Sequence, residues 1–132
     1  MNAKEIQEQI DDLNYWDSEV LQLSVDYFGD EVTIVFDNSK LLFTGCSQVH
    51  INTDPQDRKK PIKTLTRKQL PYFIQSIEVT NFQTESLAVV YFGGNKHPES
   101  TEKFNLFKCK MLMPPLDVEI YCSSIVIERN II

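Results

Sequence analysis

The sequence predicts a mainly β protein, an antiparallel sandwich or partly open barrel of seven or eight strands with one short N-terminal helix. After residue 20, apolar residues alternate with polar ones in short runs, which is the period of a strand with one buried face. Glycine, proline, asparagine and aspartate separate these runs and favour tight turns. A chain of 132 residues, 42% hydrophobic and 24% charged, is typical of one soluble domain, so we expect a single domain over residues 1–132.

The first residues predict the helix. Asn2 is a preferred N-cap residue, and Glu5 stands three positions later, where a capping box has its acid. Ile6, Ile10 and Leu13 follow at i, i+4 and i+7 and therefore share one face. This spacing predicts a short amphipathic helix.

The strands begin where the period changes to two. The odd-numbered apolar residues from Leu21 to Tyr27 would share one face of a first strand. Gly29-Asp30 supplies a turn, and the alternation over residues 31–36 predicts a returning strand. Together these runs predict a β-hairpin.

The rest of the chain predicts further strands. Residues 40–52 read as one strand that bends at Gly45, because a glycine inside a strand pattern often marks a bulge. Residues 53–71 are polar, basic and contain three prolines, which predicts a long loop. Beyond this loop we expect strands over residues 73–79, 87–92, 104–113 and 118–128, a turn at residues 83–86, a loop at residues 93–98, a stop at Pro114-Pro115 and a break at Ser123-Ser124.

Charge is distributed unevenly along the chain. The formal net charge is -6, which argues against general nucleic-acid binding because phosphate recognition needs clustered lysine and arginine. Residues 1–37 hold ten acids and one base, whereas residues 58–68 hold six bases. We interpret the basic segment as a solvated loop, with an acidic protein, RNA or acidic lipid as the alternative partner. The acidic end would steer association with a basic partner.

Composition also bears on compartment and cofactors. The apolar runs are far shorter than the ~20 residues that cross a bilayer, and the first residues do not resemble a signal peptide, so we expect no membrane contact and a cytoplasmic location. Cys46, Cys109 and Cys122 are an odd number without a paired spacing, and we expect reduced thiols, although Cys109 and Cys122 could face each other on neighbouring strands. His50 and His97 lack further ligands at a metal-binding spacing, so we expect no metal and no cofactor.

Trp16-Asp17-Ser18 stands where the helical period gives way to the strand period. A catalytic role would need a second acid, a histidine or a metal beside Asp17, or a base beside Ser18, and the spacing supplies none of these. The favoured interpretation is a structural junction, in which Trp16 fills the end of the core and the side chains of Asp17 and Ser18 bond to turn backbone. We therefore predict no catalytic residues and no enzyme activity.

The acidic helix, the run Trp16-Asp17-Ser18-Glu19-Val20 and the strands that end at Leu42-Phe43-Thr44-Gly45-Cys46 carry a resemblance. They resemble small Firmicute-type domains with a "WHDS-L" motif before a β-meander, some of which are grouped with immunity proteins of bacterial polymorphic toxin systems. The histidine of that motif is missing here. The resemblance implies a non-catalytic protein that binds another protein.

Two hypotheses about function follow. In the first, the chain is a protein-interaction domain, an immunity-type inhibitor that covers a basic toxin with acidic residues of its N-terminal third, namely Glu5, Glu8, Asp11, Asp12, Asp17 and Glu19. The alternative is a small-ligand-binding barrel or minor enzyme with a pocket near Trp16, Tyr91 and His97. Either function is compatible with a homodimer formed through exposed strand edges.

Overall fold

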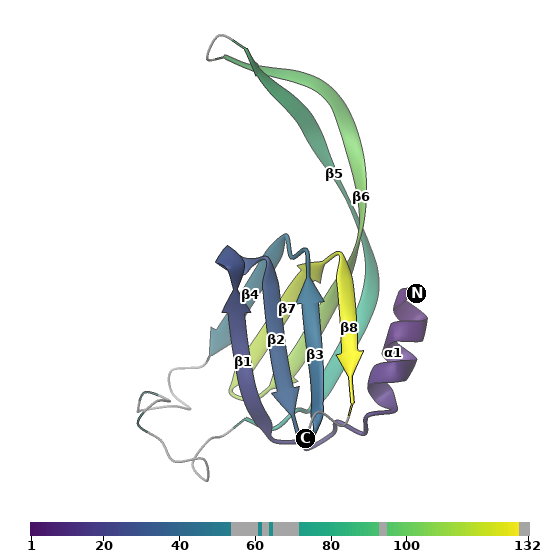
Figure 1. Ribbon diagram of the computed structural model, residues 1–132, viewed down its shortest axis with the longest axis vertical. Coiled ribbons are helices and arrows are strands. Elements are labelled where there is room, and N and C mark those ends of the chain that lie inside the picture. The colour runs from purple at the N-terminus through teal and green to yellow at the C-terminus, as the bar shows by residue number, and fades with distance from the viewer. Residues whose placement is uncertain (54–60, 62–63, 65–71, 93–94, 130–132) are drawn as a thin grey trace.

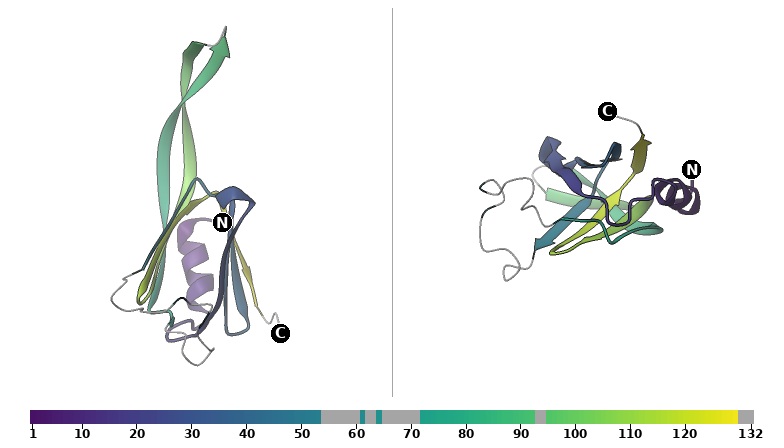
Figure 2. Two further views of the ribbon diagram at one scale, coloured as in Figure 1. Left: turned by 90° about the vertical axis from the view of Figure 1, so that its left-hand side faces the viewer. Right: turned by 90° about the horizontal axis from the view of Figure 1, so that it is seen from below.

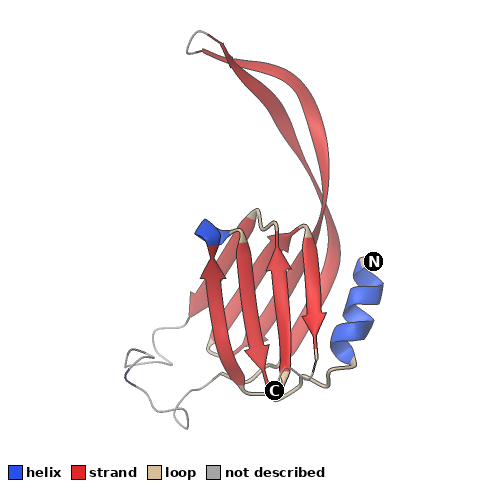
Figure 3. Cartoon of the chain, viewed as in Figure 1, coloured by secondary structure: helices blue, strands red, loops and turns tan. Residues whose placement is uncertain are grey.

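Two four-stranded antiparallel sheets face each other in the computed structural model, which describes residues 1–53, 61, 64, 72–92 and 95–129 (Figure 1). The side chains of residues 85–102 are outside this description. The strand orders are β1-β2-β3-β8 and β4-β7-β6-β5. Figure 3 shows the strands as two layers beside one α-helix, which confirms the predicted mainly β class and decides for the sandwich over the barrel.

The first sheet follows the predicted alternation. It contains β1 (Val20–Asp26), β2 (Glu31–Phe36), β3 (Ser39–Thr44) and β8 (Ser124–Glu128). In β2 and β3 every second side chain is buried. Since successive side chains of a strand point to opposite faces, one face of this sheet is apolar and packs on the second sheet. The predicted hairpin of the first two strands is confirmed, with Asp26 opposite Glu31 at its closed end.

The second sheet supplies the other half of the core. It contains β4 (Gln48–Thr53), β5 (Ser76–Phe92), β6 (Asn95–Met113) and β7 (Leu116–Cys122). A turn at Pro114-Pro115 separates β6 from β7, as predicted. The side chains of this sheet that are buried against the first sheet are Ile77, Val79, Cys109, Met111, Met113, Leu116, Val118, Ile120 and Cys122.

The predicted strand over residues 40–52 is wrong, because the chain changes sheets at Gly45 rather than bending within one strand. β3 ends in the first sheet and β4 begins in the second. Gly45 has φ +63, and a Cβ atom there would lie 2.7 Å from Ser123 Oγ. Ser123 stands at the return crossover between β7 and β8, where its amide N–H bonds to the Thr44 carbonyl at 3.0 Å. Close contact between the two crossovers therefore requires glycine at residue 45.

The predicted turn at residues 83–86 is also wrong, as is the predicted loop where it covers residues 95–98. β5 and β6 form one hairpin that pairs from Ser76 opposite Leu112 to Phe92 opposite Asn95. Only residues 107–113 of β6 pair with β7. The rest of the β5–β6 hairpin therefore extends beyond the sandwich as an arm (Figures 1 and 2). A polar run can continue a strand there, because the arm has no second sheet to pack against and needs no apolar face.

Helix α1 (Ala3–Asp11) closes one side of the sandwich, between β8 and the edge strand β5 (Figure 2). Asn2 caps it as predicted, since its side-chain oxygen accepts the amide N–H of Glu5 at 2.9 Å. Ile6 and Ile10 are fully buried. No helix in the described part of the chain has the length and apolar character needed to span a membrane.

A candidate protein-binding surface

The junction between α1 and β1 is built on Tyr15 rather than on Trp16. The side chain of Tyr15 is 3% exposed, whereas that of Trp16 is 51% exposed and stacks on the Tyr15 ring with centroids 4.3 Å apart. The prediction that Trp16 fills the end of the core is therefore wrong. The reason lies in the turn after the helix, where Asn14 adopts φ 53, a left-handed conformation that asparagine tolerates, and the next side chain enters the core.

Asp17 and Ser18 belong to a short antiparallel pairing with the residues before β5. The Asp17 amide N–H bonds to the Ile74 carbonyl at 2.8 Å, and the Ile74 amide N–H bonds to the Ser18 carbonyl at 3.0 Å. The Ser18 hydroxyl donates to Asp37 Oδ2 at 3.2 Å, not to turn backbone as predicted. Asp37 lies between β2 and β3 of the first sheet, so this hydrogen bond holds Ser18 in place, which suits a structural residue.

The predicted acidic residues divide between two adjoining elements. Glu5, Glu8 and Asp12 are exposed, and their spacing places them on the face of α1 opposite the buried isoleucines. Asp11 lies at the side of the helix, where its Oδ1 accepts a hydrogen bond from Gln7 at 2.9 Å. The helix therefore carries an acidic stripe that faces solvent.

The remaining two predicted acids follow the helix on the outer side of the junction. Asp17 is exposed, and Glu19 is half-buried and pairs through a β-bridge with Phe73. Phe73 is 47% exposed, so exposed aromatic rings accompany these acids. We call Glu5, Glu8, Asp12, Asp17, Glu19, Trp16 and Phe73 the acidic surface. Bases also lie on or beside the helix: Lys4 is exposed, and Arg129 donates to the Gln9 carbonyl at 3.4 Å.

The residues of the alternative pocket are not brought together. The barrel does not close, and Asp17 is bonded to Ile74, next to the start of β5. Tyr91 and His97 lie at the far end of the hairpin, where Tyr91 pairs with Lys96. At ~3.4 Å per residue, the length of β5 separates Tyr91 from Ile74 by roughly 55 Å. The basic segment over residues 58–68 lies mostly outside the described residues.

The cysteines and histidines have separate surroundings. Cys109 and Cys122 are buried on neighbouring strands, but Cys109 lies opposite Ile120 and Cys122 opposite Phe107, so the two thiols are diagonal neighbours. Burial raises the pKa of Cys122 to about 12. His50 is exposed and hydrogen-bonds to Gln48 Oε1 at 3.1 Å. Within the described residues, no three His, Cys, Asp or Glu side chains converge on a point that could hold a metal ion.

A groove that the sequence does not predict lies on the side of the sandwich away from α1. The groove has a volume of about 820 Å³ and lies between β4 and the turn after β1. Tyr27 was expected on the inner face of the first strand, but β1 ends at Asp26, and Tyr27–Gly29 forms a short 3-10 turn, η1. Tyr27 is 72% exposed and Phe28 fully exposed. The available signal was that Phe28 follows Tyr27 directly and so breaks the alternation of the first strand.

The turn at the groove is conformationally strained. Tyr27 has φ 52 and Phe28 has φ 59, and aromatic residues in this left-handed region cost about 1–2 kcal/mol each. Gly29 follows with φ 95, which glycine adopts readily. Cys46 lies in the groove, and desolvation together with the charge of Asp30 raises the pKa of its thiol to about 11. The thiol is therefore neutral near pH 7 and contributes an uncharged surface.

Comparison with known families finds a match over nearly the whole chain. The family Immunity protein PIM7 matches residues 2–129, which include the helix, both sheets and the hairpin arm. A search of curated proteins finds no match. The match confirms the resemblance to immunity proteins and covers nearly the full length of the chain, and the chain therefore belongs to the immunity protein PIM7 family.

Proposed function

We propose that this protein is a non-catalytic inhibitor that acts in the cytoplasm by binding a basic toxin with its acidic surface. The observation that carries the proposal is the family match over residues 2–129, since an immunity protein implies a toxin as its protein partner. Toxins that cleave nucleic acids present basic surfaces to phosphate, and such a surface is complementary to an acidic inhibitor.

The composition of the acidic surface supports this mode of binding. Glu5, Glu8 and Asp12 face solvent on one side of α1, where their charges would speed the encounter with a basic partner. Trp16 and Phe73 are half-exposed aromatics beside Asp17 and Glu19. Buried aromatic side chains supply much of the binding free energy in protein interfaces, so these two would supply affinity where the acids supply rate and specificity.

Co-expression tests the proposal. Candidate toxin domains encoded by neighbouring genes would be induced in a sensitive bacterium with or without this protein, and growth would be measured. We expect the protein to restore growth and Glu8→Lys/Asp12→Lys to restore it less. The matched control is Glu78→Lys/Asp117→Lys, which makes the same change in charge at exposed residues of the second sheet.

The outcomes separate the two parts of the proposal. Growth that is not restored by the wild-type protein, although both proteins accumulate, would contradict the inhibitor function. Growth restored equally by both double variants would leave the inhibitor function intact and overturn the role of the acidic surface. Circular dichroism of each variant would establish that the substitutions leave the fold unchanged.

A further inference from the structure

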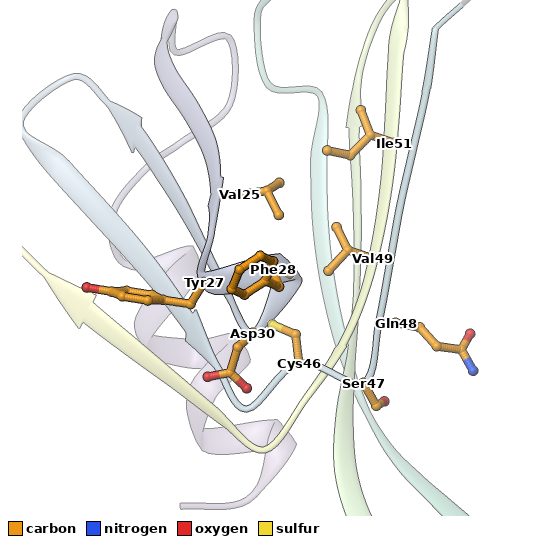
Figure 4. Close-up of a pocket in the computed structure, with 10 residues that line it drawn as sticks. Val25, Tyr27, Phe28, Asp30, Cys46, Ser47, Gln48, Val49 and Ile51 are labelled. Atoms are coloured by element: carbon orange, nitrogen blue, oxygen red, sulfur yellow. The ribbon is translucent and has the colours of Figure 1, made fainter.

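The two sheets end on the same side of the sandwich without a covering helix in the described residues. There the first sheet ends in β1 and the second in β4, and each of these strands has one neighbour in its sheet. The groove described above lies between them (Figure 4). The opposite side is closed by α1, so the sandwich is covered on one side and open on the other.

Apolar side chains on the inner faces of the two sheets line this opening. Val25 of β1 pairs with the buried Val32, and Ile51 of β4 pairs with the buried Val118, so both point between the sheets. Their exposed fractions are nevertheless 44% and 41%. Figure 4 shows Val25, Val49 and Ile51 turned toward the same space, with Phe28 beside them. Apolar side chains that stay open to solvent in this way are typical of an interaction site.

The turn η1 holds Phe28 beside this opening against a conformational cost, whereas the Tyr27 ring points away from it (Figure 4). Tyr27 and Phe28 both adopt left-handed backbone conformations, as noted above, and neither ring is buried. These two residues do not stabilise the fold, because their backbone is strained and their large apolar side chains remain in solvent. Such strain is commonly found where a protein contacts a ligand or partner.

The charges around the groove define the partner. Asp30 lines the groove, Asp26 and Glu31 lie at the adjoining strand ends, and residues 25–31 and 46–53 contain no lysine or arginine. Apolar side chains with acids beside them are complementary to an apolar side chain that has basic neighbours.

We propose that the groove binds an extended segment of a protein partner that presents a large apolar side chain between basic residues. The apolar side chain enters between Val25, Phe28 and Ile51, and the basic residues lie near Asp26 and Asp30. This surface is separate from the acidic surface on α1, so the proposal goes beyond the proposed function and can fail without it.

Amide-resolved NMR titration tests the proposal on the intact protein. The probe is the peptide acetyl-Arg-Leu-Arg-amide, compared with acetyl-Glu-Leu-Glu-amide and acetyl-Arg-Ser-Arg-amide. We expect saturable shifts at residues 25–30 and 46–51 with the first peptide, at about millimolar affinity as is usual for small flexible ligands. The acidic peptide and the serine peptide should bind at least about fivefold more weakly, because each lacks one of the two features.

Two pairs of variants serve as controls. Phe28→Ser should weaken binding at least about fivefold, whereas Phe104→Ser, at an exposed phenylalanine of β6, should not change it. Asp30→Asn should weaken binding more than Asp117→Asn, at an exposed acid of β7. Glu8→Lys/Asp12→Lys should bind the peptide as the wild type does, which keeps this test independent of the acidic surface.

Several results would overturn the proposal. They are the lack of any saturable shift at the groove, equal binding of the acidic peptide, and equal effects of Phe28→Ser and Phe104→Ser. Binding that appears only after the bases of residues 58–68 are replaced by serine would overturn it too, because the groove would then be occupied from within the chain.

Discussion

The hydroxyl of Tyr15 accepts the amide N–H of Ile77 at 3.1 Å and donates to the carbonyl of the same residue at 3.3 Å. Ile77 lies on β5, whose outer edge pairs with no strand of its sheet. One tyrosine hydroxyl therefore satisfies both backbone groups of an edge residue. Because free strand edges promote unwanted pairing, this contact protects the sheet while fixing the junction after the helix.

The first prediction concerns this hydroxyl. Tyr15→Phe should lower the free energy of unfolding by about 1–3 kcal/mol, because the Ile77 amide loses its hydrogen-bond acceptor while the Ile77 carbonyl keeps only Gln7 as donor. Trp16→Ala should change the free energy of unfolding by about 0.5 kcal/mol or less, since the Trp16 ring is half-exposed. Urea denaturation of the two variants measures both values. A larger loss for Trp16→Ala would mean that Trp16, not Tyr15, anchors the junction.

Gln7 gives the second prediction. Its Nε2 donates to the Ile77 carbonyl at 2.9 Å and its Oε1 accepts the Val79 amide N–H at 2.6 Å, so it covers the same edge from the helix. Gln7→Ala should cost about 1–2 kcal/mol of unfolding free energy. Gln9→Ala, at an exposed position of the same helix, is the control and should be near neutral. Equal effects would show that the two side-chain bonds to β5 contribute nothing.

The third prediction concerns the crossover at Gly45. Gly45→Ala and Gly29→Ala both place a side chain at a positive φ, but only at Gly45 would the new Cβ meet another atom within 4 Å, namely Ser123 Oγ. Gly45→Ala should therefore destabilise the fold more than Gly29→Ala, whose cost of about 1 kcal/mol is conformational. Ser123→Gly combined with Gly45→Ala should recover part of the loss. Additive effects in a double-mutant cycle would rule out the proposed contact.

The fourth prediction concerns pH. Desolvation raises the pKa of Cys46 from 9.0 to about 11 in the folded protein. The pKa of Cys46 is higher in the folded than in the unfolded protein. The contribution of the neutral Cys46 thiol to stability is therefore fully present below pH 9 and is lost as the pH rises through about 11. Cys46→Ser should therefore reduce the loss of stability between pH 8 and pH 11, measured by urea denaturation. An unchanged alkaline loss would place the thiolate in water.

The sequence predicted most of the fold because the strands in the sandwich have one apolar face. The alternation in β2, for example, requires a half-buried strand whatever its partners are. Alternation does not show which sheet a strand joins, so it predicts one strand over residues 40–52, where the structure has β3 and β4 in different sheets. It also fails outside the core, where the polar residues at 83–86 continue β5 into the arm.

The candidate surface was predicted less completely. The exposure of Glu5, Glu8 and Asp12 follows from the sequence, because the capping and apolar positions of α1 fix which face is exposed, and their role in binding stays a prediction. The burial of Tyr15 in place of Trp16 was not predicted, since the left-handed turn at Asn14 decides which ring turns inward and leaves little trace in the spacing. The groove depends on two strand edges from different sheets, a relationship that no local pattern carries.

The most direct test of the central claim is the association rate of this protein with the purified toxin domain, measured by stopped-flow fluorescence at increasing ionic strength. We expect a rate that falls steeply with salt, and a lower rate with weaker salt dependence for Glu8→Lys/Asp12→Lys than for Glu78→Lys/Asp117→Lys. No complex at micromolar concentrations would contradict the inhibitor function. A rate that is independent of salt and equal for both variants would contradict binding through the acidic surface.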